Sequence, residues 1–177
     1  DFDSSTPGWM LDHFATVQDG IDAVYAAGTV NVAAGTYPEN LSIAKSITLT
    51  GAQHDIDVSG RTAASASEST IQGLATVDAS NVNINGFTLT NPGQTSALYV
   101  TPSCSNITFT CNIVDNVGDV ALISNVHAIL LDQGPDSVTI AHNSFNNIKS
   151  GTMTVSAVGV LSSASTNSSS GLVIQDN

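Results

Sequence analysis

The chain is short of positive charge: its 177 residues include 3 Lys and Arg against 15 Asp and Glu, for a formal net charge of −12. Nucleic acids and anionic membrane surfaces attract a basic footprint, so this balance argues against both as partners. An acidic polysaccharide would also be repelled unless Ca²⁺ bridged it to the protein. Only 10% of the residues are charged, so Ser, Thr, Asn and Gly must form the polar surface, as in many extracellular β-proteins.

Cysteines and long apolar runs are also scarce. Cys104 and Cys111 flank a predicted strand over residues 106–110. A strand rises about 3.3 Å per residue, which holds their Cα atoms beyond the ~7 Å limit for a disulfide. We therefore expect two free thiols, with Cys111 as a small core residue. No apolar run reaches the ~18 residues of a membrane-spanning helix, so membrane insertion is not expected.

The stretch from Thr29 to Ala52 is the template for the rest of the chain. Turn-forming residues at 35–38 and 44–46 divide it into three short runs in which apolar and polar residues alternate. The apolar pairs of these runs are Val30/Val32, Leu41/Ile43 and Ile47/Leu49. Three such strands joined by tight corners predict one complete coil of a β-solenoid.

Four later segments repeat the last strand of this template. They align on residues 47–49 as Val82–Ile84, Ile107–Phe109, Val138–Ile140 and Leu172–Ile174. Their first and third positions are all apolar, as inward-facing strand positions should be. Matching strands precede the last three segments, at residues 97–100, 128–131 and 157–160. The uneven spacing, taken up by insertions at 53–69, 113–126 and 162–170, favours a parallel β-helix with loops at its corners.

Asparagines recur at corresponding corners of the predicted coils. One set is Asn112, Asn143 and Asn177, and the other is Asn91, Asn116 and Asn147. Stacked asparagines can hydrogen-bond from coil to coil, so both sets predict ladders.

Residues 15–27 predict one amphipathic helix ahead of the first coil, with Thr16 able to cap its start and Gly28 to end it. Its apolar stripe comprises Val17, Ile21, Val24 and Tyr25. Such a helix would cover the open apolar end of a solenoid. We therefore divide the chain into an N-terminal segment with the capping helix at 1–28 and a β-helix of about five coils at 29–177.

These elements together resemble the pectin-lyase-like superfamily. Residues 14–23 are similar to its capping helix, residues 30–51 to its first coil and residues 81–88 to its later coils. The resemblance implies an all-β fold, a right-handed parallel β-helix with an N-terminal capping α-helix. The superfamily includes pectate lyases, polygalacturonases, pectin esterases, phage tailspikes and secreted bacterial surface proteins, so the fold does not select a function.

Catalytic chemistry finds little support in the residues. Lyases of this fold use Ca²⁺ held by clustered carboxylates and a basic residue, whereas the one arginine, Arg61, is expected as a solvated loop charge. Glycosidases need two carboxylates about 5–9.5 Å apart. In the predicted register Asp115, Asp132 and Asp136 each align with uncharged residues, so no catalytic residue is assigned. Loop acids at 53–69 or 113–126 could still converge, which keeps a carbohydrate-active enzyme as an alternative.

Two acidic pairs are candidate Ca²⁺ ligands, and no other cofactor is expected. Asp55 and Asp57 share one loop, and Asp115 and Asp119 flank a short Asn-Val-Gly segment. Ca²⁺ prefers carboxylate and carbonyl oxygens, which both segments offer.

Tyr99 and Trp9 are candidate exposed rings for stacking on a sugar. Tyr99 lies between inward-facing Leu98 and Val100, so its side chain is expected to point outward. With such rings the chain would serve as a carbohydrate-binding module, which binds a polysaccharide without turnover.

No capping element follows the last predicted coil, so we expect an apolar end that self-association, a longer chain or a partner protein covers. The leading interpretation is an extracellular structural or adhesive β-helix module of a microbial surface protein, without catalysis. The alternatives are an enzyme of the polysaccharide lyase or glycoside hydrolase type and a carbohydrate-binding module.

Overall fold

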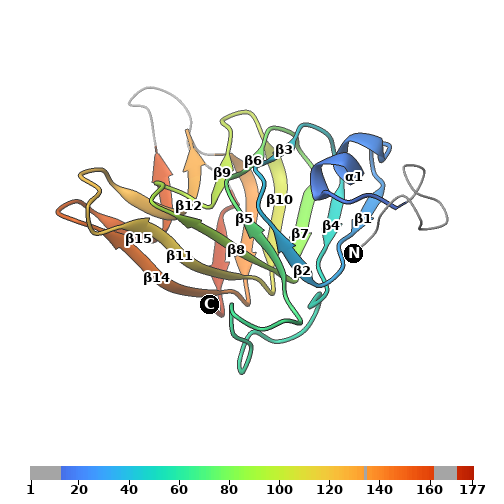
Figure 1. The fold of residues 1–177 in the computed structure, drawn as a ribbon. Helices are drawn as coiled ribbons and strands as arrows, with labels where there is room; N and C mark the ends of the chain where they lie inside the picture. The colour runs from blue at the N-terminus through green and yellow to red at the C-terminus, as the bar shows by residue number, and fades with distance from the viewer. Residues whose placement is uncertain (1–12, 134, 162–170) are drawn as a thin grey trace.

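The computed structural model describes residues 13–133, 135–161 and 171–177, and it confirms the all-β, parallel β-helix fold. Three parallel sheets stack their strands along one axis (Figure 1). Each coil adds one strand to each sheet in turn, so the described residues form five coils and the first strand of a sixth.

The three sheets are numbered in the order in which the chain enters them. Sheet 1 consists of β1 (Thr29–Asn31), β4 (Thr48–Thr50), β7 (Val82–Asn85), β10 (Ser105–Thr110), β13 (Asp136–Ala141) and β16 (Val173–Gln175). Sheet 2 consists of β2 (Gly35–Tyr37), β5 (Ser69–Gln72), β8 (Phe87–Pro92), β11 (Ile113–Asp119) and β14 (Ser144–Ser150). Sheet 3 consists of β3 (Leu41–Ile43), β6 (Ala75–Val77), β9 (Leu98–Val100), β12 (Val126–Asp132) and β15 (Val155–Leu161).

The register of sheet 1 is the one that the repeats predict. Leu49, Ile84, Phe109 and Ile140 are successive partners across the sheet. Each is at most 3% exposed, so they form one inward column of the core. Burying such a side chain contributes about 1.5–3 kcal/mol, which makes the repeated apolar position the main reason why the coils stack.

The first coil differs from the prediction in the placement of its strands. β1 pairs with β4 and sets Val30 beside Leu49, so the first and third predicted runs lie in one sheet on neighbouring coils. The first coil contributes β2 at Gly35–Tyr37 to sheet 2, a strand that the sequence does not predict. The sequence predicts a turn there instead, because Gly35 and Pro38 are turn-forming residues. The predicted insertion at 113–126 is also partly wrong, because β11 occupies its first half.

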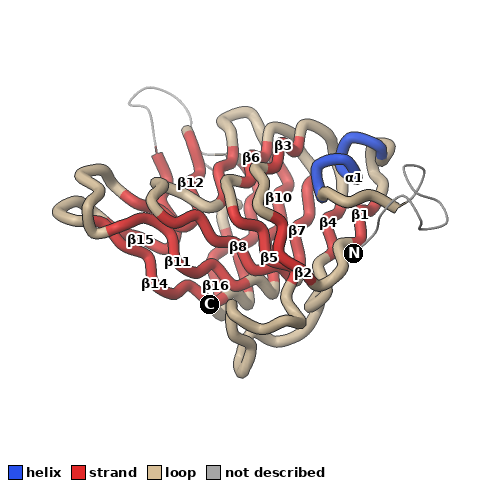
Figure 2. The backbone as a smooth tube through the Cα atoms, in the orientation of Figure 1, coloured by secondary structure: helices blue, strands red, loops and turns tan. Residues whose placement is uncertain are grey.

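The predicted capping helix is present at the β1 end of the stack (Figure 2, blue). α1 spans Val17–Ala23, and Thr16 Oγ1 accepts the N–H of Asp19 as expected of a helix cap. The backbone turns extended at Val24, so the helix ends before Gly28. Tyr25 lies beyond the end of the helix, so it does not belong to the apolar stripe in which it was predicted, and it is 89% exposed.

The first coil holds this helix at both ends. At its start the Glu39 carboxylate accepts the N–H groups of Val17 and Gln18 at 2.9 and 3.0 Å. At its end Lys45 Nζ donates to the carbonyl oxygens of Asp22 and Val24, both at 2.9 Å. A negative charge at the N-terminus and a positive charge at the C-terminus both favour the helix dipole, which compensates for its short length.

One of the two predicted asparagine ladders is confirmed. Asn143 Oδ1 accepts from the backbone and side-chain nitrogens of Asn112 at 2.9 and 3.2 Å. Asn177 Oδ1 accepts from the same two groups of Asn143, both at 2.9 Å. Asn112 and Asn143 are 0% and 1% exposed. These three residues are called the asparagine ladder below.

The second predicted ladder is wrong because β11 contains a bulge. The register between β11 and β8 shifts between Val114 and Val117, so Asn91 pairs with Val117 instead of Asn116. The Asn91 side chain donates to the carbonyl oxygen of Ser96 at 2.6 Å. Asn147 donates to Asp115 at 2.7 Å, so these amides serve local contacts.

Both cysteines are free, as predicted, but Cys104 and not Cys111 is the core residue. Cys104 is 5% exposed. Cys111 is half-buried at a corner with φ of +55°, in the same left-handed conformation as Gly86 and His142 on the neighbouring coils. Burial raises the pKa of the Cys111 thiol, which disfavours the reactive thiolate.

Candidate functional site

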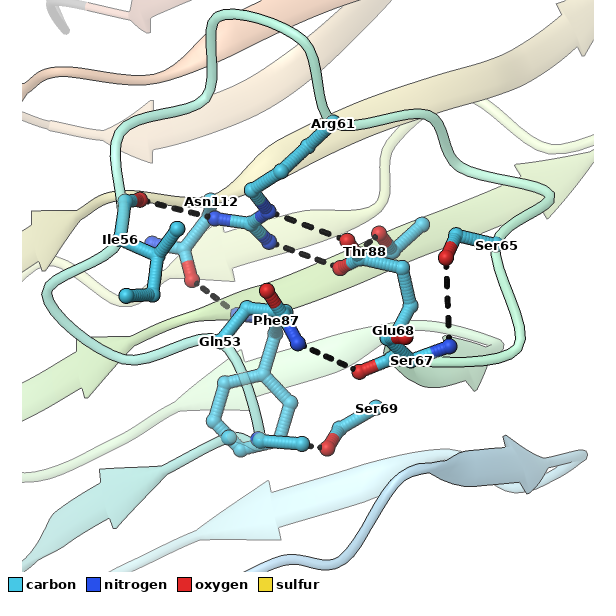
Figure 3. Close-up of polar contacts among 12 residues, drawn as sticks. Gln53, Ile56, Arg61, Ser65, Ser67, Glu68, Ser69, Phe87, Thr88 and Asn112 are labelled. Atoms are coloured by element: carbon cyan, nitrogen blue, oxygen red, sulfur yellow. Dashed lines mark hydrogen bonds and ion pairs between the residues drawn. The ribbon is translucent and has the colours of Figure 1, made fainter.

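The segment between β4 and β5, residues 53–68, folds back over the side of the β-helix (Figure 3). Arg61 forms a two-pronged ion pair with Glu68, with Nε to Oε1 at 3.0 Å and Nη2 to Oε2 at 2.7 Å. The Thr88 hydroxyl donates to the same Oε2 at 2.9 Å. The side chains of Arg61 and Glu68 are 7% and 1% exposed, so the expected solvated arginine is wrong.

Arg61 also ties this segment to the fourth coil. Its Nη1 donates to the carbonyl oxygens of Ile56 at 3.2 Å and Cys111 at 2.7 Å. Asp55 adds a second attachment, because Asn85 Nδ2 donates to Asp55 Oδ1 at 2.7 Å and Asn85 Oδ1 accepts the Asp55 N–H at 3.0 Å. The segment is therefore a fixed wall against the coils.

A hollow of about 700 Å³ lies between this wall and the outer face of sheet 2. Its wall side consists of residues 63–66 and Glu68. Its floor is polar and includes Thr36, Thr70, Gln72, Thr90, Asn91, Gln94, Asp115 and Asn116. Hydroxyl and amide groups thus dominate the floor.

A second hollow of about 500 Å³ continues from the first toward sheet 3. The two share Gln72, Asn91 and Gln94. The second hollow adds Asn40, Gly73, Leu74, Thr95, Ser96, Tyr99 and Leu130. Because the three shared residues line both hollows, the hollows adjoin at the corner between sheets 2 and 3, and together they are called the side groove below.

The bulge in β11 shapes the floor of the side groove. It sets both Asp115 and Asn116 opposite one stretch of β8, and Asn116 adopts a φ of +53°. β14 follows the same path, with Asp115 beside Asn146. Bulges redirect side chains and are frequent next to binding sites. Here the bulge brings Asp115 and Asn116 to the edge of the first hollow.

Tyr99 is on the outer face of sheet 3, as the strand pattern predicts. It lies between Thr76 and Leu130 in the register of the sheet, and with Leu130 it lines the second hollow. Its hydroxyl donates to Asp132 Oδ2 at 2.6 Å. This bond fixes the end of the ring and raises the pKa of the Tyr99 phenol, with burial and the Asp132 charge as further causes. Trp9, the other candidate ring, lies outside the described residues.

The four candidate Ca²⁺ ligands are engaged in local hydrogen bonds. Asp55 bonds Asn85, and Asp57 accepts the Ser59 N–H at 2.6 Å. Hydrogen bonds from Ser59 hold the pKa of Asp57 below its usual value. Asp119 accepts the N–H of Ala121 at 2.8 Å, and Asp115 accepts from Asn147. Among the residues that the structure describes, no group of three or more His, Cys, Asp or Glu could hold a metal ion.

The opposite end of the stack from α1 exposes apolar side chains. β14, β15 and β16 are the outermost strands of their sheets. The exposed residues there are Val155, Val160, Leu161, Val173 and Ile174, each 40–49% accessible. Val155, Val160 and Ile174 continue inward columns whose preceding members, Val126, Leu131 and Ile140, are 0% exposed, so these three are core positions that no further described coil covers.

No family model, curated protein sequence or solved structure matches this chain. Helices long and apolar enough to cross a membrane are absent from the described part of the chain. The interpretation therefore depends on the side groove itself. Its central residues Gln72 and Gln94 were not candidates in the sequence, because isolated glutamines carry no recognisable motif.

Proposed function

We propose that this chain is a non-catalytic, adhesive β-helix module of an extracellular microbial surface protein and that its side groove binds carbohydrate. The observation that carries the proposal is the lining of the groove, in which amides and hydroxyls surround one fixed aromatic ring, Tyr99. Sugars offer many hydroxyl groups and a weakly polar ring face, which these side chains complement. The paucity of charged residues, at 10% of the chain, supports an extracellular setting.

Relationship to the pectin-lyase-like superfamily is part of the same proposal. The parallel coils, the capping helix α1 and the motif at residues 30–51 support it. That superfamily contains both enzymes and surface proteins, so the groove has to decide between them.

The carboxylates of the groove favour binding over catalysis. Glu68 accepts two hydrogen bonds from Arg61 and one from Thr88, so both of its oxygens are occupied. A carboxylate held in this way is a poor nucleophile and a poor proton donor. Asp115 is then the one remaining acid on the described lining of the groove, whereas a glycosidase needs two.

A panel of soluble and insoluble polysaccharides tests this proposal. The purified protein is incubated with each polymer, with and without Ca²⁺, and bound protein, new reducing ends and unsaturated products are measured. Binding without products supports the proposal. Products that disappear in Asp115→Asn would establish the enzyme alternative, and the absence of binding to every polymer would contradict the groove as a carbohydrate site.

The exposed apolar end supports a second part of the proposal, self-association or contact with further coils of a longer chain or a partner. Val173 and Ile174 present the edge of sheet 1 there. We expect light scattering and electron microscopy to show concentration-dependent assemblies that Ile174→Asp reduces. Tyr25→Asp, on the exposed side of the capping end, is the control. Assemblies that Ile174→Asp leaves unchanged would contradict this part.

A further inference from the structure

The two hollows of the side groove indicate the size of its ligand, provided that the groove binds carbohydrate as proposed. Their volumes are about 700 and 500 Å³, and each lies in the range of about 300–1,000 Å³ typical of a complete small-molecule site. Gln72, Asn91 and Gln94 belong to both hollows. A site with two adjoining compartments fits a ligand made of repeating units better than one sugar.

The charges on the groove indicate the chemical class of those units. Neither hollow has a Lys, Arg or His on its described lining. The Glu68 carboxylate is balanced by Arg61, but Asp115 has no cationic partner and accepts only the amide of Asn147 in the described chain. A uronate or sulfate group in the first hollow would therefore face an uncompensated carboxylate on a protein of net charge −12.

Two kinds of free recognition groups remain on the groove. The side chains of Gln72 and Gln94 are exposed at the boundary between the hollows, and their amides make no hydrogen bond to the described part of the chain. Tyr99 and Leu130 are neighbours in the outward column of sheet 3 and give the second hollow an apolar patch. Amides can bond sugar hydroxyls, and an aromatic ring can stack on a sugar ring.

We infer that the side groove binds an uncharged glycan chain of at least two sugar units. One ring lies on the Tyr99 and Leu130 patch, and the adjoining unit occupies the first hollow. Gln72 and Gln94 bond the hydroxyl groups near the linkage. Asp115 excludes chains that carry carboxylate or sulfate groups.

The length dependence is tested with a mono-, di- and tetrasaccharide series of neutral glucans, mannans and chitin fragments, by titration calorimetry on the full chain. We expect the tetrasaccharide of the accepted series to bind at least about tenfold more tightly than its monosaccharide. Tyr99→Ala should weaken tetrasaccharide binding by about tenfold, because it removes the stacked ring, while Tyr99→Phe retains most of the affinity. Equal affinity for mono- and tetrasaccharide, or a Tyr99→Ala effect below about twofold with the fold intact by circular dichroism, would overturn the inference.

The charge selection is tested with uronate oligosaccharides of matched length, at low and high salt. We expect the uronates to bind the wild-type chain at least about tenfold more weakly than neutral chains of the same length. Asp115→Asn should lower the ratio of neutral to uronate affinity, whereas Asp22→Asn, the same charge change on α1, should leave the ratio unchanged. Uronates that bind as tightly as neutral chains would overturn the inference and leave the proposed function standing. Failure of every glycan, neutral or acidic, to bind would overturn the proposed function itself.

Discussion

The asparagine ladder and the side groove use the same chemical group in opposite ways. In the ladder the amides of Asn112 and Asn143 are at most 1% exposed, and each is bonded to neighbouring coils. In the groove the amides of Gln72 and Gln94 are exposed and have no partner in the described chain. A satisfied buried amide stabilises the fold, and an unsatisfied exposed amide is available to a ligand.

The backbone explains why the two sites differ. The ladder lies at the corner between sheets 1 and 2 in the fourth and later described coils, where the chain keeps the same path and side chains can repeat a bond along the axis, whereas in the second coil the segment 53–68 leaves from that same corner. At the groove the segment 53–68, the loop after β8 and the bulge in β11 interrupt this repetition. Irregular corners of a regular solenoid are therefore the place to look for function.

Arg61 is the residue whose loss should have the largest effect on this comparison, because its side chain fixes the wall of the groove through Glu68 and through the carbonyl oxygen of Cys111, the residue next to Asn112 of the ladder. Removing one partner of a buried ion pair costs about 3–5 kcal/mol, since the other charge is left uncompensated. We expect Arg61→Met to lower the free energy of unfolding in urea by about 3 kcal/mol. The segment 53–68 should also become sensitive to limited proteolysis, and glycan binding should be lost.

Two variants control for this prediction. Arg61→Met combined with Glu68→Leu removes both charges and should recover much of the lost stability, because no buried carboxylate remains unpaired. Lys149→Met changes an exposed cation and should stay within about 0.5 kcal/mol of the wild type. A single Arg61→Met variant with unchanged stability and unchanged proteolysis would show that the ion pair does not hold the wall.

The second prediction removes one side-chain amide from the ladder and one from the groove and compares the two losses of stability. Asn112 Oδ1 accepts the N–H of Phe87 at 2.8 Å, and its Nδ2 donates to the carbonyl oxygen of Ile84 at 3.0 Å. Asn112→Ala removes both hydrogen bonds and takes the side-chain acceptor away from the buried N–H of Phe87, and an unsatisfied buried group costs roughly 1–3 kcal/mol. We expect a loss of about 2–3 kcal/mol in urea unfolding followed by circular dichroism. Gln72→Ala should change stability by less than about 0.5 kcal/mol and weaken glycan binding.

Two outcomes would contradict the comparison between the ladder amides and the groove amides. If Gln72→Ala destabilised the fold as much as Asn112→Ala, the groove amides would be structural. If Asn112→Ala kept its stability, water would have to replace the ladder bonds at that corner.

Sheet 1 was predictable because its signal is local. The pattern of Ile47 and Leu49 recurs in four later segments, and period-2 alternation fixes which side chains point inward. The register of Leu49, Ile84, Phe109 and Ile140 followed from it directly. The asparagine ladder was predictable for the same reason, because its residues keep a constant distance from these strands.

Sheet 2 and the groove were less accessible because their signals depend on contacts distant in sequence. β2 has only three residues, Gly35–Tyr37, and its turn-like composition hid the strand. Arg61 reads as an ordinary loop charge until the fold brings it to Glu68 and to the carbonyl of Cys111, fifty residues away. The alignment of Gln72 with Thr90 requires the register of β5 and β8, which the repeats of sheet 1 do not fix.

The smallest expected effect concerns the one ring of the groove. The bond from Tyr99 to Asp132 raises the pKa of the phenol above its ordinary value of 10.0. A group whose pKa is raised on folding adds stability below its unfolded pKa, and that stability is lost as the pH rises through the folded value. The Tyr99 to Asp132 bond should therefore persist through neutral pH and break only in alkali.

Alkaline titration of tyrosinate absorbance measures this directly. We expect Asp132→Asn to shift one transition to lower pH, and Tyr99→Phe to remove that transition, which assigns it. Tyr37 is an internal control, because burial and Glu39 raise its pKa and neither involves Asp132. If Asp132→Asn left every transition in place, the carboxylate would not hold the ring. The Tyr99 ring would then be free to move. The groove would differ from the ladder both in its unbonded amides and in a ring that no hydrogen bond fixes.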